Sequence, residues 1–252
     1  MTITRKVWTR YIENLRKVND EAARLASAYL TTHNVLTPEG TDALIEYCYG
    51  LATKYGEAAA ELAAQMYDAL AAATGATVAP AMPAATATMQ ETAKAVVGTL
   101  KTGNNEIVSS AVGRLVKMAG VDTTMQNAIR DGAEWAWIPV GDTCAFCITL
   151  ASRGWQRASK KALKGNHAEH IHANCDCTYA IRFDDSEVED YDPRMYEEMY
   201  YGAEGRTPEQ RINAMRREDY ARNREEINAQ KRSAYEKRKE RESSEAEEIN
   251  AD

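Results

Sequence analysis

Four of the five cysteines and three of the four histidines fall within one short stretch of the chain. Cys144 and Cys147 form a CxxC pair, and about 25 residues later the sequence HIHANCDC contains His172, Cys175 and Cys177. Thiolate sulfur and imidazole nitrogen are the ligands that zinc prefers, and both sulfurs of a CxxC can bind one ion. The spacing therefore predicts a zinc site built from these five candidates.

A tetrahedral site needs four ligands, of which Cys144 and Cys147 supply two. His172 and Cys175 are the preferred remaining pair, because residues three apart can share one turn of the chain. Cys177 is an almost equal alternative, since Cys175 and Cys177 point the same way if the chain is extended. Lower-ranked reserve ligands are His167 and His170.

Three other interpretations of the cysteines stay open. A redox dithiol would place the CxxC at a helix start in a βαβ context, whereas helix followed by loop is expected here. Disulfides would need an oxidising compartment, and the first ten residues have no apolar signal-peptide core. Burial as unbonded core cysteines would leave the close pairing with histidines as a coincidence.

A catalytic metal would need an open coordination position and a nearby base, for which Asp142, Glu169 and Asp176 are candidates. HIHAN also partly resembles the histidine and asparagine of zinc-supported HNH nucleases. The Asp-His pair and the later histidine of such a site are missing from the sequence, so we expect a closed, structural site with no catalytic residues.

The elements before this cluster are predicted to be helices. Apolar residues recur at helical spacing through the first thirty positions and again from Leu44 to Leu70. Thr37-Pro38-Glu39 supplies a cap, a proline for the first helical position and an acid for the positive helix end. We expect two antiparallel helices within residues 1–74, with Cys48 as a core residue.

Residues 75–88 contain two prolines and mostly small side chains, which predicts a linker or an extended arm. Helical spacing resumes in residues 89–132, with a break at Gly103. We expect a second break at Gly120 and a short helix from Thr124 to Gly132.

Residues 133–183 form a loop-rich Cys/His module that ends in a strand-like CTYAIRF. Residues 184–205 carry nine acidic residues and one basic residue, and we interpret them as an acidic connector. Residues 206–252 carry twelve of each and predict a mixed-charge helix. This last region contains a near-repeat at an offset of fifteen residues, with Ile212, Asn213, Arg217 and Tyr220 recurring. It favours a partner-binding strip and a solvated helix equally.

The composition predicts one large domain or two small ones with a sizeable core in a chain of 252 residues. The expected fold class is mainly α, with a helical N-terminal region, a small zinc-stabilised α+β module and a charged C-terminal helix. A net charge of -7 argues against binding nucleic acid over the whole surface. No stretch reaches the roughly 18 apolar residues of a membrane span, and we expect no membrane partner.

The order of motifs in residues 120–183 resembles the conserved end of the Mu F-like minor head proteins of tailed bacteriophages. The elements that carry the resemblance are Trp135, Trp137, Asp142, Cys144, Cys147, Gly154, His172, Cys175 and Cys177. The family's segment looks like HPxCRC, whereas this chain has HANCDC. Asp176 therefore replaces a positive charge beside the thiolates.

The resemblance implies a minor capsid protein at the portal vertex of the virion, made in the host cytoplasm, with ejection alongside DNA as an open alternative. Portal and other capsid proteins would be its partners, with residues 1–74 as the candidate contact. Two rival functions are kept: a zinc-supported nuclease, and a DNA-binding factor acting during packaging or DNA entry. In the second rival, Lys160, Lys161 and Lys164 would contact phosphates, although a solvated loop explains them as well.

Overall fold

The computed structural model describes residues 2–3, 5–139, 143–159, 178–189, 191–225, 228–229 and 232. The chain divides into two compact units, one of Met1–Thr143 with Arg153–Pro193 and one of Cys144–Ser152 with Arg194–Asp252. The described residues are mainly helical with a few short strands, which confirms the mainly α class. Within the described ranges, no helix is long and apolar enough to cross a lipid bilayer.

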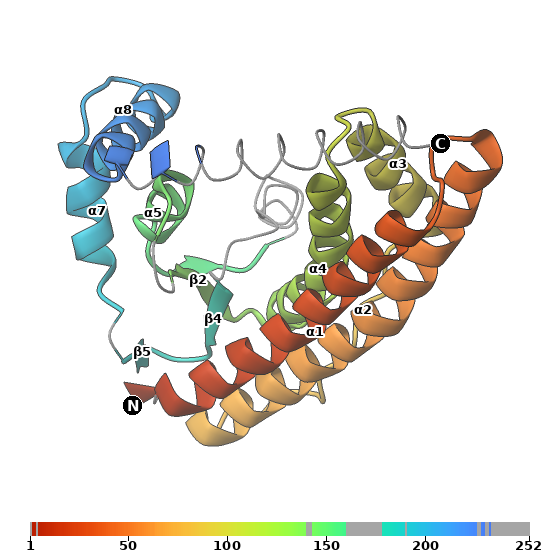
Figure 1. Cartoon of the computed structure of the whole chain (residues 1–252). Helices are drawn as coiled ribbons and strands as arrows, with labels where there is room; N and C mark the ends of the chain where they lie inside the picture. The colour runs from red at the N-terminus through yellow and green to blue at the C-terminus, as the bar shows by residue number, and fades with distance from the viewer. Residues whose placement is uncertain are drawn as a thin grey trace, which may run out of the picture. The chain divides into compact units, whose positions relative to one another are not determined.

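Three long helices form the core of the larger unit: α1 (Arg5–Thr32), α2 (Pro38–Thr74) and α4 (Asn105–Asp131). The apolar stripe expected in the first thirty residues is buried at Tyr11, Leu15, Ala22, Ala26 and Leu30. Helices α1 and α2 lie side by side, and α4 packs against both (Figure 1). The two predicted N-terminal helices are therefore confirmed.

The start of α2 follows the predicted capping pattern. The Thr37 hydroxyl accepts a hydrogen bond from the N–H of Gly40 at 3.1 Å, and Pro38 occupies the first helical turn. Cys48 is completely buried on the core face of this helix. Burial in an apolar setting disfavours the thiolate and raises the pKa of Cys48 to about 12, as expected for a core thiol.

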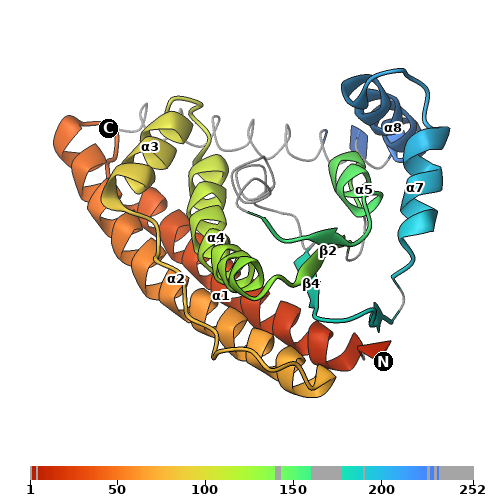
Figure 2. The ribbon, with the colours of Figure 1, turned by 180° about the vertical axis from the view of Figure 1, so that it is seen from behind.

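Residues 75–88, which we call the strap, run back along the helices to α3 (Met89–Leu100) (Figure 2). The strap is not helical, as expected, but side chains of α2 and α4 hold its backbone. The Asn127 amide accepts from the N–H of Met82 at 3.0 Å and donates to its carbonyl at 2.9 Å. The Arg130 guanidinium donates to the carbonyls of Ala79 and Pro80 at 2.6 and 3.0 Å.

Helix α4 runs unbroken from Asn105 to Asp131, so the predicted break at Gly120 and the separate helix after Thr124 were wrong. Glycine at 120 serves packing instead. A Cβ there would lie 3.2 Å from the backbone oxygen of Ala59, which shows how closely α4 approaches α2. The predicted break at Gly103 is present, and that residue has a φ of 66° between α3 and α4.

A three-stranded antiparallel sheet of order β3-β2-β4 packs beside α2 and α4. Its strands are β2 (Glu134–Ile138), β3 (Gln156–Arg157) and β4 (Thr178–Arg182). The strand predicted at the end of CTYAIRF is thus β4. A second, parallel pair joins β1 (Thr2–Ile3) to β5 (Glu187–Val188).

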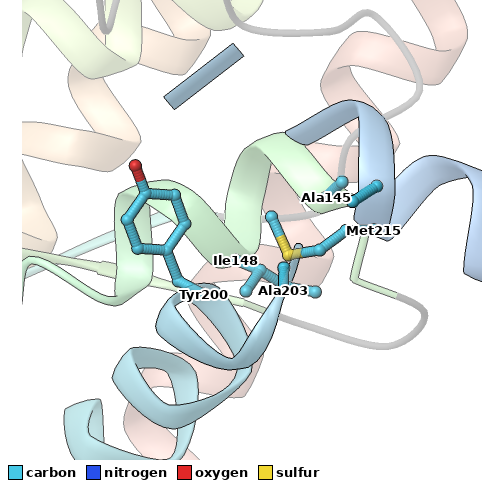
Figure 3. Packing of buried hydrophobic residues seen from close by; sticks show 6 residues of the cluster. Ala145, Ile148, Tyr200, Ala203 and Met215 are labelled. Atoms are coloured by element: carbon cyan, nitrogen blue, oxygen red, sulfur yellow. The ribbon is translucent and has the colours of Figure 1, made fainter. Parts of the chain in front are cut away.

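The smaller unit contains α5 (Ala145–Ala151), α7 (Pro193–Gly202) and α8 (Pro208–Arg222). Its apolar cluster joins one face of α5 to both other helices, and Figure 3 shows these side chains packed together. The buried members are Ala145, Ile148, Tyr200, Ala203, Ala214 and Met215. Helix α8 begins with a capping box between Thr207 and Gln210, and it confirms helix in the first part of residues 206–252.

Candidate metal centre

The structure describes two of the five predicted zinc ligands. Cys144 and Cys147 lie in the smaller unit. His172, Cys175 and Cys177 lie outside the described residues, as do the reserve ligands His167 and His170. The candidate bases Asp142, Glu169 and Asp176 and the lysines Lys160, Lys161 and Lys164 also lie outside them.

The CxxC motif opens helix α5. Cys144 is the N-cap residue, with an extended backbone at φ -68° and ψ 156°, and its carbonyl accepts a hydrogen bond from Ile148 at 3.0 Å. Cys147 is the third residue of the helix. These are the two positions that exchange side-chain-to-backbone hydrogen bonds in a capping box, so Cys144 and Cys147 are neighbours at the start of α5. Cys144 is exposed and Cys147 is buried.

Apolar packing fixes the start of α5. Ala145 and Ile148, on either side of Cys147 in the sequence, are both 7% exposed and pack in the cluster with Tyr200 and Met215 (Figure 3). Because these contacts bury one face of a helix of only seven residues, they determine the direction in which α5 begins. The position of the CxxC therefore depends on α7 and α8.

Strands β2 and β4 are paired in the sheet of the larger unit. Ile138, the last residue of β2, pairs with Thr178, the first residue of β4.

Arg182 joins two strands of this sheet and is a contact that the sequence did not predict. Its guanidinium contacts the Glu134 carboxylate across the β2–β4 pair, at 2.6 and 2.7 Å. It also lies 4.5 Å from the ring centre of Trp155. The alternation in CTYAIRF was the available signal, since it placed Arg182 on the same face as Ala180, which is fully buried.

The two described thiols can do two kinds of chemistry. They can supply half of a tetrahedral zinc site, or they can act as a redox dithiol, because the CxxC does start a helix and follows a strand. The antiparallel sheet differs from the βαβ setting of that redox chemistry. Among the described residues, no group of three or more His, Cys, Asp or Glu side chains could hold a metal ion.

A separate surface feature lies on α8. Asn213, Arg216, Arg217 and Tyr220 line an open hollow with a volume of about 450 Å³. Asn213, Arg217 and Tyr220 belong to the near-repeat in the sequence, which was the signal for this feature. The hollow lies within the smaller unit.

Comparison with known proteins gives one family. Residues 2–203 match the family described as VG15 protein, which includes the helical region and the whole Cys/His segment. No curated protein and no solved structure matches the chain. The match confirms the bacteriophage origin implied by the sequence resemblance, whereas the assignment to Mu F-like minor head proteins stays a prediction. The chain therefore belongs to the VG15 protein family of phage gene products.

Proposed function

We propose that this phage protein is a minor capsid component at the portal vertex of the virion. The observation that carries the proposal is the motif order in residues 120–183, from the buried Trp135 and Trp137 through the CxxC to the strand β4. That order resembles the Mu F-like minor head proteins. Membership of a phage family over residues 2–203 supports it.

Peptide mass spectrometry of purified virus particles tests this function. We expect the chain at a few copies for each portal assembly. A chain abundant in the lysate and missing from purified particles would contradict the proposal and would favour an assembly factor or an intracellular enzyme. Peptide coverage from residue 1 to 252 would also reveal any processing of the ends.

We assign the portal contact to the connection between α1 and α2. Leu36 is 86% exposed there, and beside it the rings of Tyr29, His33 and Tyr47 form a stack with centre distances of 3.9 and 4.3 Å. Burial of this leucine side chain by a partner would remove its apolar surface from water, which favours binding. Deleting residues 1–74 would be a poor test, because α1 and α2 form the core with α4.

A point substitution tests this contact without removing the core. Leu36→Glu should abolish co-purification with portal protein, because a carboxylate would have to lose its water in the interface. Met82→Glu is the matched control, since Met82 is 70% exposed on the strap. Equal portal binding by both variants would contradict the assigned contact.

We further propose that a zinc ion is bound by Cys144, Cys147 and two of His172, Cys175 and Cys177. The described cysteines fit this role, because N-cap and third-position side chains lie at one end of α5. When bound, zinc supplies a cross-link within a segment that the sequence predicts to be rich in loops. Four protein ligands would fill the tetrahedral site and leave no position for a reacting water, so we expect stabilisation rather than catalysis.

Native mass spectrometry of reduced protein tests the zinc proposal. We expect one zinc for each chain, lost on chelation and lost in Cys144→Ser and Cys147→Ser. Cys48→Ala is the control and should keep its zinc, because Cys48 lies in the core of the larger unit. Protein without zinc, whose mass falls by about two daltons on oxidation as one disulfide forms, would instead identify a redox pair.

A further inference from the structure

One face of α8 combines basic, aromatic and amide side chains. Asn213, Arg216, Arg217 and Tyr220 are spaced at i, i+3, i+4 and i+7, which places them along one side of a helix. They line the open hollow of about 450 Å³, and Tyr220 is 42% exposed. We call these four residues the arginine face. The opposite side of α8 is buried through Ala214 and Met215.

The arginine face carries two guanidinium groups, and the carboxylate of Glu209 lies one turn before Asn213 on the same side of the helix. Glu218 lies roughly 100° round the helix from Arg217. Asp219 follows Arg216 by three residues but pairs with Arg222 at 3.7 Å. Arg217 contacts Glu204 at 4.0 Å, but the two side chains are 68% and 89% exposed. Such a pair contributes little and is easily displaced. Within the described ranges, Arg216 has no ion pair.

The same set of side-chain types occurs a second time in the sequence. Asn228, Lys231, Arg232 and Tyr235 follow the residues of the arginine face at an offset of fifteen. A solvated helix needs charged residues on its surface, but it does not need one amide, two cations and one tyrosine in the same order. The recurrence indicates that the four residues act as a unit toward a ligand that itself repeats.

We propose that the arginine face binds single-stranded nucleic acid. Guanidinium groups form forked hydrogen bonds with phosphate, and an exposed tyrosine can stack on an unpaired base. The Asn213 amide can donate to a phosphate or to a base edge. An acidic protein surface would use the arginines equally well, whereas stacking of Tyr220 on a base is specific to nucleic acid. This site is distinct from the proposed zinc site and does not depend on the capsid role.

Fluorescence anisotropy with the full chain and a labelled 20-nucleotide oligo-dT tests the proposal. Arg216→Ala/Arg217→Ala should weaken binding at least about tenfold and reduce the slope of log affinity against log salt by about 1.4, the value for two phosphate contacts. Tyr220→Ala should weaken oligo-dT binding about fivefold or more, since stacking of one base is worth that much. The same substitution should leave binding to a duplex of equal length unchanged.

The charge-matched control is Arg206→Ala/Arg222→Ala. It removes two exposed arginines from the same unit outside the arginine face, and it should change oligo-dT affinity less than about twofold. If both double variants lost oligo-dT affinity equally, net charge alone would explain the binding, and the proposal would be overturned. Polyglutamate that binds as tightly as oligo-dT, with the same dependence on Arg216 and Arg217, would identify an acidic protein partner and also overturn it. Unchanged thermal unfolding of each variant excludes misfolding as the cause.

Discussion

At the scale of single residues, the position of Asp122 on α4 disfavours its ionised carboxylate. Burial, and to a smaller extent the charge of Glu91, raises the pKa of Asp122 to about 6. The folded protein therefore binds a proton more tightly than the unfolded chain, whose aspartates titrate near 3.9. The stability that this proton provides is complete below pH 4 and is lost as the pH rises through 6.

Asp122→Asn should therefore stabilise the protein at pH 7 by about 2 kcal/mol and change little at pH 4. The full shift in the pKa of Asp122 would correspond to roughly 3 kcal/mol. The expected value is smaller because the side chain is partly exposed and water screens its charge. Urea unfolding at both pH values measures the difference. Asp20→Asn, at an exposed position on α1, is the control and should change the free energy of unfolding by less than about 0.5 kcal/mol at either pH. An Asp122→Asn variant that is less stable than the natural protein at pH 7 would contradict this explanation.

Arg182 links strands β2 and β4 of the small sheet through its side chain. Its side chain is only 15% exposed and joins Glu134 on β2 to the ring of Trp155, which follows α5 in the chain. Arg182→Met keeps much of the apolar stem but removes both charged contacts, and it should cost about 2 kcal/mol of unfolding free energy. Urea unfolding followed by tryptophan fluorescence measures this loss.

Comparison with Glu134→Gln separates the two contacts of Arg182. The side-chain amide oxygen introduced by this substitution can still accept a hydrogen bond from the guanidinium, and Arg182 keeps its position over Trp155, so the loss should be about 1 kcal/mol. Arg182→Met without any effect would show that the sheet is held by strand pairing and by the buried tryptophans alone.

At the scale of elements, the strap illustrates a contact that sequence pattern does not reveal. A linker of small residues and prolines has no apolar stripe of its own, so periodicity predicts only that it is not helical. In the structure, Asn127 is 2% exposed and pairs with both backbone groups of Met82, much as a neighbouring strand would. The strap is thereby part of the larger unit.

Asn127→Ala should release the strap from α4. The N–H and carbonyl of Met82 would lose their partners, which should cost about 2 kcal/mol of stability and increase hydrogen exchange at the Met82 amide. Gln126→Ala, at the exposed neighbouring position on α4, is the matched control and should change neither quantity. Unchanged exchange at Met82 in Asn127→Ala would show that the strap is held without this amide.

The sequence predicted those elements whose signals are local. The start of α2 depends on Thr37 and Pro38, and β4 depends on alternation, so both could be read from a few neighbouring residues. The continuity of α4 could not, because Gly120 is retained for its approach to Ala59 on another helix. For the candidate site, the CxxC was recognisable from spacing alone, but its place at the start of α5 depends on Tyr200 and Met215, more than fifty residues later.

At the scale of the whole molecule, the residues that pack around the CxxC extend beyond the part of the chain that matches the family. The match to VG15 proteins ends at residue 203, before α8 begins. Ala214 and Met215 of α8 nevertheless complete the apolar cluster that buries Ala145 and Ile148 beside the CxxC. A chain shortened to residue 203 would expose this cluster to water. The residues after 203 therefore support the candidate metal centre, in addition to carrying the arginine face.

Removal of metal should affect the two parts of the molecule differently. The described core of the larger unit consists mainly of apolar residues, and its buried residues include Cys48 but no histidine. Chelation should therefore leave at least about 80% of the far-ultraviolet helical signal unchanged. The near-ultraviolet signal should change, because Trp135 and Trp137 lie in β2, whose end leads to the CxxC. Circular dichroism of the reduced protein before and after chelation, with zinc added back, measures both signals. Cooperative loss of the helical signal on chelation would mean that the metal holds the long helices as well, and the two-part description would then have to be abandoned.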